Sequence, residues 1–482
     1  MHLSEQTGWD YVRAAFQRIW GYDDFRPPQG EIIHSLLAHQ DALVVMPTGG
    51  GKSICFQLPA LLRTGLTLVV SPLVALMENQ VQELHQRSLP AALLHGELPS
   101  YQRRQTLLDV QRQHLRLLYL SPETLLSPPV WEVLCQPHLK INGLILDEAH
   151  CLVQWGDTFR PTYRRLGAAR LELVKRKPPN TRIGIAAFTA TADPHAQGVI
   201  QDVLGLKNPD IFRLNPYRSN LHLAVQTTWT PRGRRQQLLK FIRQHPEQAG
   251  LVYVRTRRDS ESLATWLSEK GYKTAAYHAG LSPDERRYME TAWLKGDLQF
   301  VVCTSAFGMG INKPDVRWVI HFHAPMLLSE YVQEVGRAGR DGKAADALTL
   351  VSEPTGWLDP EDKQRLHFFQ ERVRSQQRLA QELVQQLPTE GDVNTITTQF
   401  KQGAIALSLL HSSGQLNWQD PFHYVLTSTQ LPQFPKQEQG VQQMLQFLTT
   451  SECRWKFLLQ AFGFGDDAKS MRCGHCDRCL SR

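Results

Sequence analysis

A glycine-rich run that ends in Lys-Ser is the first stretch of the chain with the spacing for phosphate chemistry. Residues 46–53 read Met-Pro-Thr-Gly-Gly-Gly-Lys-Ser and follow a short apolar run. In a phosphate loop of this kind, backbone N–H groups face the phosphate oxygens, the lysine reaches the β and γ phosphates, and the hydroxyl binds Mg²⁺. The general pattern has glycine where this chain has Met46, and a flexible glycine turn is the alternative. The residues predicted to bind the phosphates of a nucleotide are Thr48, Gly49, Gly50, Gly51, Lys52 and Ser53.

A pair of carboxylates, Asp147 and Glu148, follows another apolar run later in the chain. At the end of a buried strand, Asp147 is placed to hold Mg²⁺ together with Ser53, and Glu148 to polarise the attacking water. An isolated Asp-Glu pair is more often a solvated surface feature. The preceding strand favours the catalytic interpretation, and with Lys52 these carboxylates predict ATP hydrolysis.

Two arginines, Arg337 and Arg340, complete this set of phosphate-handling residues. They are three residues apart, a spacing that would put both on one face of a helix. From a second lobe they can approach the γ-phosphate as arginine fingers, and Gln333 is predicted to assist them. A pair of surface arginines is the alternative. The glycines at positions 336 and 339 favour close approach of the backbone and therefore the catalytic interpretation.

Four of the eight cysteines cluster near the C-terminus with the spacing C-x19-C-x2-C-x2-C. Thiolates from Cys453, Cys473, Cys476 and Cys479 would complete a tetrahedral structural Zn²⁺ site with no open position. His475 lies within the cluster and is the alternative ligand. Disulfide bonds are a rival interpretation, but they need an oxidising compartment that nothing else in the sequence indicates.

An aromatic and basic segment, residues 155–163, comes directly after the two carboxylates. Trp155 and Phe159 can stack on bases, and Arg160 can neutralise a phosphate. Core packing is the alternative, and composition alone would favour it. The position beside the predicted hydrolysis site instead indicates a loop that senses DNA and couples strand contact to ATP turnover.

Short, continuous apolar runs precede these motifs and predict the elements that position them. Such runs are typical of central strands in a parallel sheet covered on both faces, where ligands bind at the strand ends. The runs in the first half of the chain are residues 42–46, 67–71, 117–120, 144–147 and 183–188, and those in the second are 251–254, 300–303 and 319–322. Only the first group carries a phosphate loop. We therefore expect an α/β protein with two similar lobes and one nucleotide in the cleft between them.

The pattern changes near residue 353. A polar, glutamine-rich helical stretch is followed by a short apolar helix at 403–414 and a hairpin with its turn at Asp420-Pro421. Helix followed by hairpin is the shape of a winged helix, and an unspecialised helical linker is the alternative. The predicted domains are a first lobe at 1–210, a second lobe at 211–355, a helical linker at 356–379, a winged helix at 380–432 and a small helical zinc-binding module at 433–482.

The length and the net charge of the chain limit the number of domains and the classes of partner that we expect. At 482 residues the chain is too long for one core. A net charge of +7 is a mild indication of a polyanionic partner. The sequence shows no signal peptide and no apolar stretch long enough to span a membrane, so we expect a cytoplasmic protein with no membrane partner.

Taken together, these motifs resemble the RecQ family of DNA helicases, within the second helicase superfamily. The likeness covers about residues 16–351 and 440–479. It includes the segment 21–29, the runs 71–73 and 188–192, and the motif 306–313. The resemblance implies two RecA-like lobes and a nucleotide whose adenine stacks on Tyr22 and is bound by Arg26 and Gln29. It also implies that Ser71 and Thr189 hold phosphates of the DNA strand.

The family implies ATP- and Mg²⁺-dependent unwinding with 3′-to-5′ polarity, and roles in recombination and repair. The expected partners are single-stranded DNA, forked or junction duplexes, and unspecified repair proteins, for a nucleoid-associated monomer. Two alternatives remain: an RNA helicase, and a DNA-binding or annealing scaffold whose ATPase only regulates its grip.

Three departures from the family pattern are visible. The aromatic loop has Asp157 and Thr158 where the family usually has His and Asp. Over a hundred residues separate Arg340 from Cys453, so any winged helix precedes the zinc module instead of following it. The C-terminal helical nucleic-acid-binding domain common in the family is absent. A short, bacterial-type member is the best description.

Overall fold

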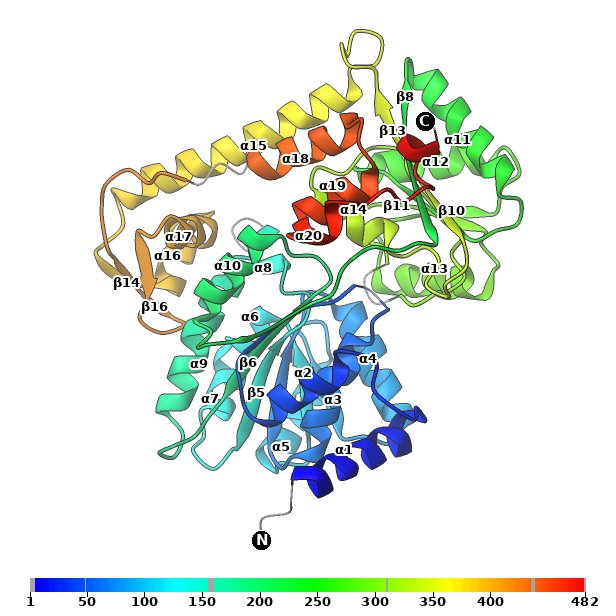
Figure 1. Cartoon of the computed structure of the whole chain (residues 1–482). Coiled ribbons are helices and arrows are strands. Elements are labelled where there is room, and N and C mark those ends of the chain that lie inside the picture. Colours follow the sequence, from blue (N-terminus) through cyan, green and yellow to red (C-terminus); the bar gives the residue numbers. More distant parts are fainter. Residues whose placement is uncertain (1–4, 48, 155–159, 309–310, 435–437, 481–482) are drawn as a thin grey trace. The chain divides into compact units, whose positions relative to one another are not determined.

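The computed structural model describes residues 5–47, 49–154, 160–308, 311–434 and 438–480 (Figure 1). The chain forms two compact units, each built from two separate stretches of sequence. Unit 1 contains Met1–Leu214 and Ser375–Pro435, and unit 2 contains Asn215–Arg374 and Lys436–Arg482. The polypeptide therefore crosses between the units three times.

The centre of unit 1 is a seven-stranded parallel sheet of order β3-β4-β2-β5-β6-β1-β7. Its strands are β1 (Ala42–Val45), β2 (Leu66–Val70), β3 (Ala91–Leu94), β4 (Leu117–Leu120), β5 (Ile141–Leu146), β6 (Gly184–Thr189) and β7 (Asp210–Arg213). Neighbouring residues of one strand, such as Leu43 and Val44, belong to two different hydrophobic clusters. Both faces of the sheet are thus covered, as the continuous apolar runs predict.

Helices on the two faces of this sheet supply the covering side chains. They are α1 (Glu5–Trp20), α2 (Gln29–Leu37), α3 (Lys52–Leu62), α4 (Val74–Gln86), α5 (Ser100–Gln111), α6 (Pro122–Leu125), α7 (Pro128–Leu134), α8 (Cys151–Gln154), the 3₁₀ helix η1 (Pro161–Arg165), α9 (Leu166–Lys175) and α10 (Pro194–Leu204). The phosphate loop and the carboxylates follow β1 and β5, at the carboxyl ends of the strands, where ligands bind in open α/β sheets.

Unit 2 is built in the same way around a six-stranded parallel sheet of order β10-β11-β9-β12-β13-β8. The strands are β8 (Leu221–Thr228), β9 (Gly250–Tyr253), β10 (Thr274–Tyr277), β11 (Phe300–Cys303), β12 (Trp318–His321) and β13 (Ala345–Ser352). The helices between them are α11 (Pro231–Gln244), α12 (Arg257–Ser268), α13 (Pro283–Lys295) and α14 (Leu328–Val335). The prediction of two RecA-like parallel-sheet lobes is confirmed.

A long helix, α15 (Glu361–Val384), leads from unit 2 back to unit 1. There the chain forms β14 (Glu390–Asp392), α16 (Val393–Gln399), α17 (Gly403–Ser412), β15 (Leu416–Trp418) and β16 (His423–Leu426). The three strands make an antiparallel sheet of order β14-β16-β15. This is the helix followed by a hairpin that the sequence predicts within 380–432.

The last stretch of the chain belongs to unit 2 and is helical. It contains α18 (Glu438–Thr449), α19 (Arg454–Ala461), α20 (Gly465–Ala468) and α21 (Asp477–Leu480). Trp455 is buried and its indole N–H donates to the Leu221 carbonyl on β8 at 3.1 Å. Arg454 is also buried and forms an ion pair with Asp477, 2.6 Å between Nε and Oδ1. Asp477 in turn accepts from the Val225 N–H of β8 at 3.1 Å.

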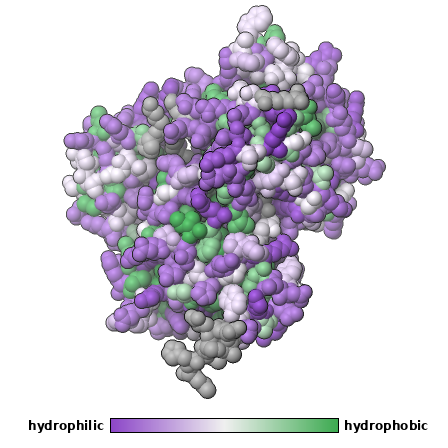
Figure 2. Space-filling view, in the orientation of Figure 1, coloured by the Kyte–Doolittle hydropathy of each residue, from purple (hydrophilic) through white to green (hydrophobic). Residues whose placement is uncertain are grey.

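The molecular surface drawn in Figure 2 is mostly hydrophilic, with small apolar patches. Among the described residues, no helix is long and apolar enough to cross a membrane.

Candidate nucleotide, DNA and zinc sites

The phosphate loop lies between β1 and α3, and α3 begins at Lys52. Gly49 and Gly51 have φ angles of 87° and 78°, a left-handed conformation that side chains disfavour. The Lys52 ammonium nitrogen is buried and has no hydrogen-bond partner among the described residues. A buried, unpaired cation at a helix N-terminus is the feature expected of a phosphate site. Thr48 lies outside the described residues.

The segment predicted to recognise adenine contacts this loop through Gln29. The Gln29 amide donates from Nε2 to the Gly50 carbonyl at 3.1 Å, and its Oε1 accepts from the Arg26 backbone N–H at 2.9 Å. The φ of Gly51 favours glycine, and a Cβ there would lie 2.4 Å from Gln29 Nε2 and would displace this amide. Tyr22 is half exposed, with its ring 5.8 Å from that of Phe16. Adenine segment and phosphate loop therefore form one local structure.

Asp147 follows β5 and is buried, with 4 % of its surface exposed. Gln80 on α4 donates from Nε2 to Asp147 Oδ2 at 3.1 Å. Burial and the neighbouring Glu148 carboxylate raise the pKa of Asp147 to about 6, while Lys52 and Gln80 act in the opposite direction. A carboxylate held this way fits a divalent cation, because bound positive charge would offset both effects that raise its pKa.

Glu148 has a φ of 53°, an uncommon conformation for a residue with a side chain. This turn directs its carboxylate to His150, 3.3 Å between Oε2 and Nδ1. His150 also lies 3.1 Å from the Thr189 hydroxyl, measured from Nδ1 to Oγ1. The end of β6 is thereby connected to the carboxylates at the end of β5.

Thr189 and Ser71, which the family resemblance assigns to DNA phosphates, are buried at 0 % and 1 % exposure. The Thr189 hydroxyl contacts His150 and donates to the Thr191 carbonyl at 3.1 Å. Ser71 Oγ has no hydrogen-bond partner among the described residues. In this conformation neither side chain reaches the surface, and their contact with DNA stays a prediction.

The aromatic segment is only partly described. Trp155 and Phe159 lie outside the described residues, as do positions 157 and 158. Arg160 forms an ion pair with Glu123 of α6, 2.8 Å between Nη1 and Oε2. Its contact with a DNA phosphate stays a prediction, and this ion pair would compete with it.

In unit 2, α14 carries Gln333 and ends at Val335. Arg337 and Arg340 lie in the non-helical turn segment that follows α14, so the expectation that both lie on one face of a helix is wrong. The physical reason is the left-handed conformation of Gly339, whose φ of 60° cannot continue an α-helix. Arg340 donates to the Ile311 carbonyl at 3.2 Å.

Arg337 is buried and packs against the backbone of Gly308, to whose carbonyl oxygen its Nη1 donates. A Cβ at Gly308 would lie 2.6 Å from the guanidinium carbon, so this close approach requires glycine. Arg340, three residues later, is partly exposed. The catalytic roles assigned to Gln333, Arg337 and Arg340 stay predictions.

Sequence reasoning missed a buried ionic network beneath this segment. Arg255, two residues after the end of β9, donates from Nη2 to Glu334 Oε2 at 2.9 Å. The same carboxylate oxygen lies 3.0 Å from His321 Nε2. Arg255 holds the pKa of Glu334 below its usual value although burial opposes this. The available signal was position, since Arg255 and His321 lie at the ends of adjacent parallel strands.

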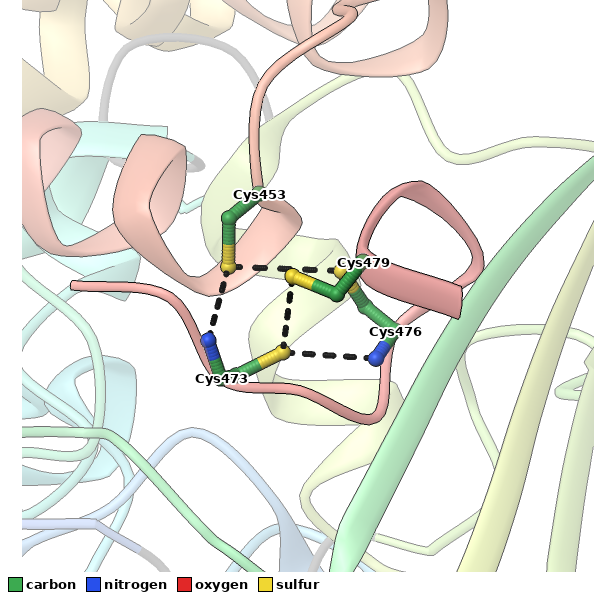
Figure 3. A group of neighbouring side chains, drawn as sticks. All are labelled: Cys453, Cys473, Cys476 and Cys479. Carbon is green, nitrogen blue, oxygen red and sulfur yellow. Dashed lines mark hydrogen bonds between the residues drawn. The ribbon is translucent and has the colours of Figure 1, made fainter. Parts of the chain in front are cut away.

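The four C-terminal cysteines converge on one point (Figure 3). Their sulfur atoms all lie within 4.8 Å of one another, with 3.8 Å between Cys473 and Cys479 and 4.0 Å between Cys476 and Cys453. A Zn–S distance of about 2.3 Å gives a tetrahedral edge of about 3.8 Å, so the four thiols fit zinc. Disulfide bonds would need sulfurs about 2 Å apart. His475 instead contacts the Tyr217 hydroxyl at 3.2 Å.

The segment 380–432, which the sequence predicts to be a winged helix, packs on the lobe of unit 1. Helix α17 contacts η1, and six of its ten residues are buried. Phe422 packs edge-on against Trp131 of α7, with ring centroids 5.5 Å apart. Arg165 of η1 donates from Nη1 to the Pro421 carbonyl at 3.0 Å. Because η1 also contacts α8, these residues connect the hairpin to the helix that follows Glu148 and His150.

Comparison with protein-family models finds three matches along the chain. Residues 26–199 match the DEAD/DEAH box helicase model, residues 233–342 the helicase conserved C-terminal domain, and residues 419–480 the RecQ zinc-binding model. Among solved structures, the Mycobacterium smegmatis helicase Lhr bound to ssDNA and AMP-PNP is similar at a TM-score of 0.60 and 19% identity. That match covers 91% of this chain and 61% of the other. At this identity the likeness shows the fold.

Two curated relatives are similar in sequence. An ATP-dependent DNA helicase RecQ from Synechocystis is 53% identical over 471 residues, which is 97% of this chain and 98% of the relative. An ATP-dependent DNA helicase RecQ from Pasteurella multocida is 38% identical over 369 residues, and the match covers 75% of this chain and 56% of that longer relative. Because the first match extends over nearly the whole of both proteins, the chain belongs to the RecQ helicase family.

Proposed function

We propose that this protein is an ATP- and Mg²⁺-dependent DNA helicase that moves along one DNA strand and separates duplexes. The observation that carries the proposal is the buried ammonium nitrogen of Lys52, which has no hydrogen-bond partner among the described residues, in the same unit as the buried Asp147 of a chain of the RecQ family. The alternative of an RNA helicase is not favoured, because the relatives of 36% to 53% identity are named DNA helicases.

In the proposed hydrolysis, Lys52 and the N–H groups of the loop bind the β and γ phosphates. Ser53 and Asp147 are the residues that would hold Mg²⁺, which when bound neutralises charge on the phosphate oxygens. Glu148 orients the attacking water and accepts its proton. The buried position of these carboxylates strengthens their electrostatic effect on the phosphates.

The second lobe completes the mechanism in this proposal. Arg337 and Arg340 stabilise the charge that develops on the γ-phosphate, assisted by Gln333. Cycles of ATP binding and hydrolysis advance the protein along the strand with 3′-to-5′ polarity. We propose single-stranded and forked or junction DNA as substrates, a monomer as the working form, and repair and recombination at the nucleoid in the cytoplasm as the setting.

The test is steady-state ATPase activity with and without single-stranded DNA. Wild-type protein should be stimulated by DNA, and Lys52→Ala should lose activity by several orders of magnitude because no other cation replaces the bound ammonium. Lys175→Ala is the matched control, since this lysine is exposed on α9 of the same unit and should leave turnover within about twofold. Near-normal turnover in Lys52→Ala would remove the phosphate-loop assignment.

Unwinding itself needs a second measurement. A strand-displacement assay should release the labelled strand with ATP and not with a non-hydrolysable analogue. Equal displacement with both nucleotides would contradict a motor and support the scaffold with a regulatory ATPase. Stimulation by matched RNA equal to that by DNA would contradict the choice of DNA.

A further inference from the structure

The most exposed large apolar side chain in the described part of the protein is Trp357, at 85 %. It lies in the loop 353–358 between β13 and α15, the yellow loop that projects at the top of Figure 1. Trp229, 63 % exposed, directly follows the neighbouring strand β8. Thr228 and Ser352, the last residues of these two strands, are paired in register. Two exposed tryptophans thus occupy one corner of the carboxyl end of the sheet.

The loop is built around the Glu353 carboxylate, which is 3 % exposed. Oε2 accepts from the Thr355 N–H at 2.6 Å and the Thr355 hydroxyl at 2.5 Å, while Oε1 accepts from the Leu358 N–H at 3.0 Å. The Thr355 hydroxyl in turn accepts from the Trp357 N–H at 3.2 Å. These bonds fix the backbone on both sides of Trp357, so little conformational entropy remains to be lost when a ligand contacts the ring.

A buried ion pair anchors the C-terminal end of the same loop. Arg234 and Asp359 are both 0 % exposed, with 3.0 Å between Nη2 and Oδ2. Arg234 also pairs with Asp362 at 3.0 Å and donates to the Ser352 hydroxyl at 2.6 Å. A fully buried arginine therefore holds the end of this loop in place. Such an anchor indicates an ordered loop.

At this end of the unit, the acidic side chains named below are engaged by hydrogen bonds or ion pairs, whereas several basic side chains are exposed. The carboxylates of the loop and of the start of α15 are engaged, Glu353 by N–H groups, Asp359 by Arg234, and Glu361 by Arg365 at 3.0 Å. Exposed cationic side chains lie in the first turns of α11, α12 and α15. Arg232, Arg257 and Arg258 form no ion pair among the residues that the structure describes, and Lys363 donates to the Thr355 carbonyl of the loop.

Exposed aromatic rings beside unpaired cations are the composition that binds single-stranded nucleic acid without regard to sequence, since every base has a face that can stack. Ligands also bind at the carboxyl ends of strands in open parallel sheets. We propose that the loop 353–358, with Trp229, is a base-stacking site for single-stranded DNA in unit 2. This inference rests on the proposed function, because it names a further contact for the same substrate.

The test measures the affinity of full-length protein for fluorescein-labelled oligodeoxythymidylate by anisotropy. Trp357→Ala should weaken binding by about 5- to 150-fold, the loss expected for one stacked base, and Trp357→Phe should restore most of the affinity. Tyr288→Ala is the matched control, since Tyr288 is 70 % exposed on α13 of the same unit. It should change the affinity by less than about twofold.

A second pair of variants guards against an indirect effect of Trp357→Ala on folding. Trp229→Ala should weaken binding in the same direction, and Arg232→Ala should lower the slope of log affinity against log salt by about 1. If wild-type protein binds no oligonucleotide, the proposed function itself fails. If wild type binds and the two tryptophan variants bind equally well, only the stacking site is overturned, and the loop becomes a candidate contact for a protein.

Discussion

At the scale of single residues, Gln80 orients the carboxylate of Asp147, the predicted Mg²⁺ ligand. Its amide N–H occupies Oδ2, and the Glu148 backbone N–H occupies Oδ1 at 3.0 Å. Both donors fix the carboxylate plane in a site where burial disfavours the charged form. Gln80 therefore acts through Asp147 and is a positioning residue.

Replacing Gln80 by Ala should lower ATP turnover by roughly ten- to a hundredfold, because a buried hydrogen bond to a charged group is lost. Gln105→Ala is the matched control, since its amide donates to Asp109 at 3.3 Å on an exposed helix surface. Steady-state kinetics with saturating DNA and varied Mg²⁺ checks the prediction. Turnover within twofold of wild type at every Mg²⁺ concentration would contradict a positioning role.

Residue types and spacing predicted which local motifs form. They did not predict which residues each side chain contacts. The four sulfurs of the zinc site and the position of Lys52 at a helix start follow from local sequence. Arg160 pairing with Glu123, and Arg337 packing on Gly308, depend on residues distant in sequence. In the sequence, an arginine that contacts solvent, a phosphate or another part of the protein looks the same.

At the scale of elements, the apolar helix α17 of the predicted winged helix is packed against the first lobe. Helix α17 packs on η1, and the hairpin residue Phe422 joins the core of the first lobe. A recognition helix in a DNA groove needs a free face, and here the buried side of α17 faces protein. We therefore expect the segment to stabilise the first lobe beside the predicted catalytic carboxylates.

His411 of α17 makes this packing depend on pH. Burial, and then the charge of Arg164, lower its pKa to about 4. A histidine with a depressed folded pKa must be neutral in the folded state, so stability is full above the unfolded pKa of about 6.5 and falls as the pH is lowered toward 4. Between pH 7 and pH 5 unit 1 should lose roughly 2 kcal/mol through this one residue.

Urea unfolding of wild type and His411→Gln at the two pH values checks this prediction. The wild type should lose more stability than the variant on acidification, because glutamine does not titrate. His114→Gln is the control, since His114 is exposed in the same unit. Identical losses in wild type and His411→Gln would mean that the histidine is solvated in solution.

At the scale of the whole molecule, the continuous apolar runs predicted the central strands except β13, and they predicted none of the strands at the sheet edges. Strand β7 is half exposed, with Ile211 at 49 %, and carries no continuous apolar run. The predicted winged helix and the zinc module are consecutive in the chain, and the sequence gives no sign that they pack on different parts of the molecule. In the structure they belong to different units. Packing of this kind depends on complementary surfaces, and neither the spacing of apolar residues nor a short motif predicts such surfaces.

This division predicts that zinc stabilises one unit only. Cys476 is fully buried and lies in the same hydrophobic cluster as Leu221, Tyr331 and Trp455 of unit 2. Cys476→Ser should lower zinc content and shift the thermal transition of unit 2 downward, because structural zinc contributes folding free energy. The transition of unit 1, recognised by its upward shift with an ATP analogue, should stay in place.

Calorimetry with metal analysis separates the outcomes. Cys135→Ser is the matched control, a thiol of unit 1 outside the sulfur cluster, and it should leave the zinc content unchanged. Full loss of zinc with unchanged melting of unit 2 would show that the cluster is peripheral to its core. A downward shift of both transitions together would mean that the two units unfold as one cooperative body, against the separate cores that their packing indicates.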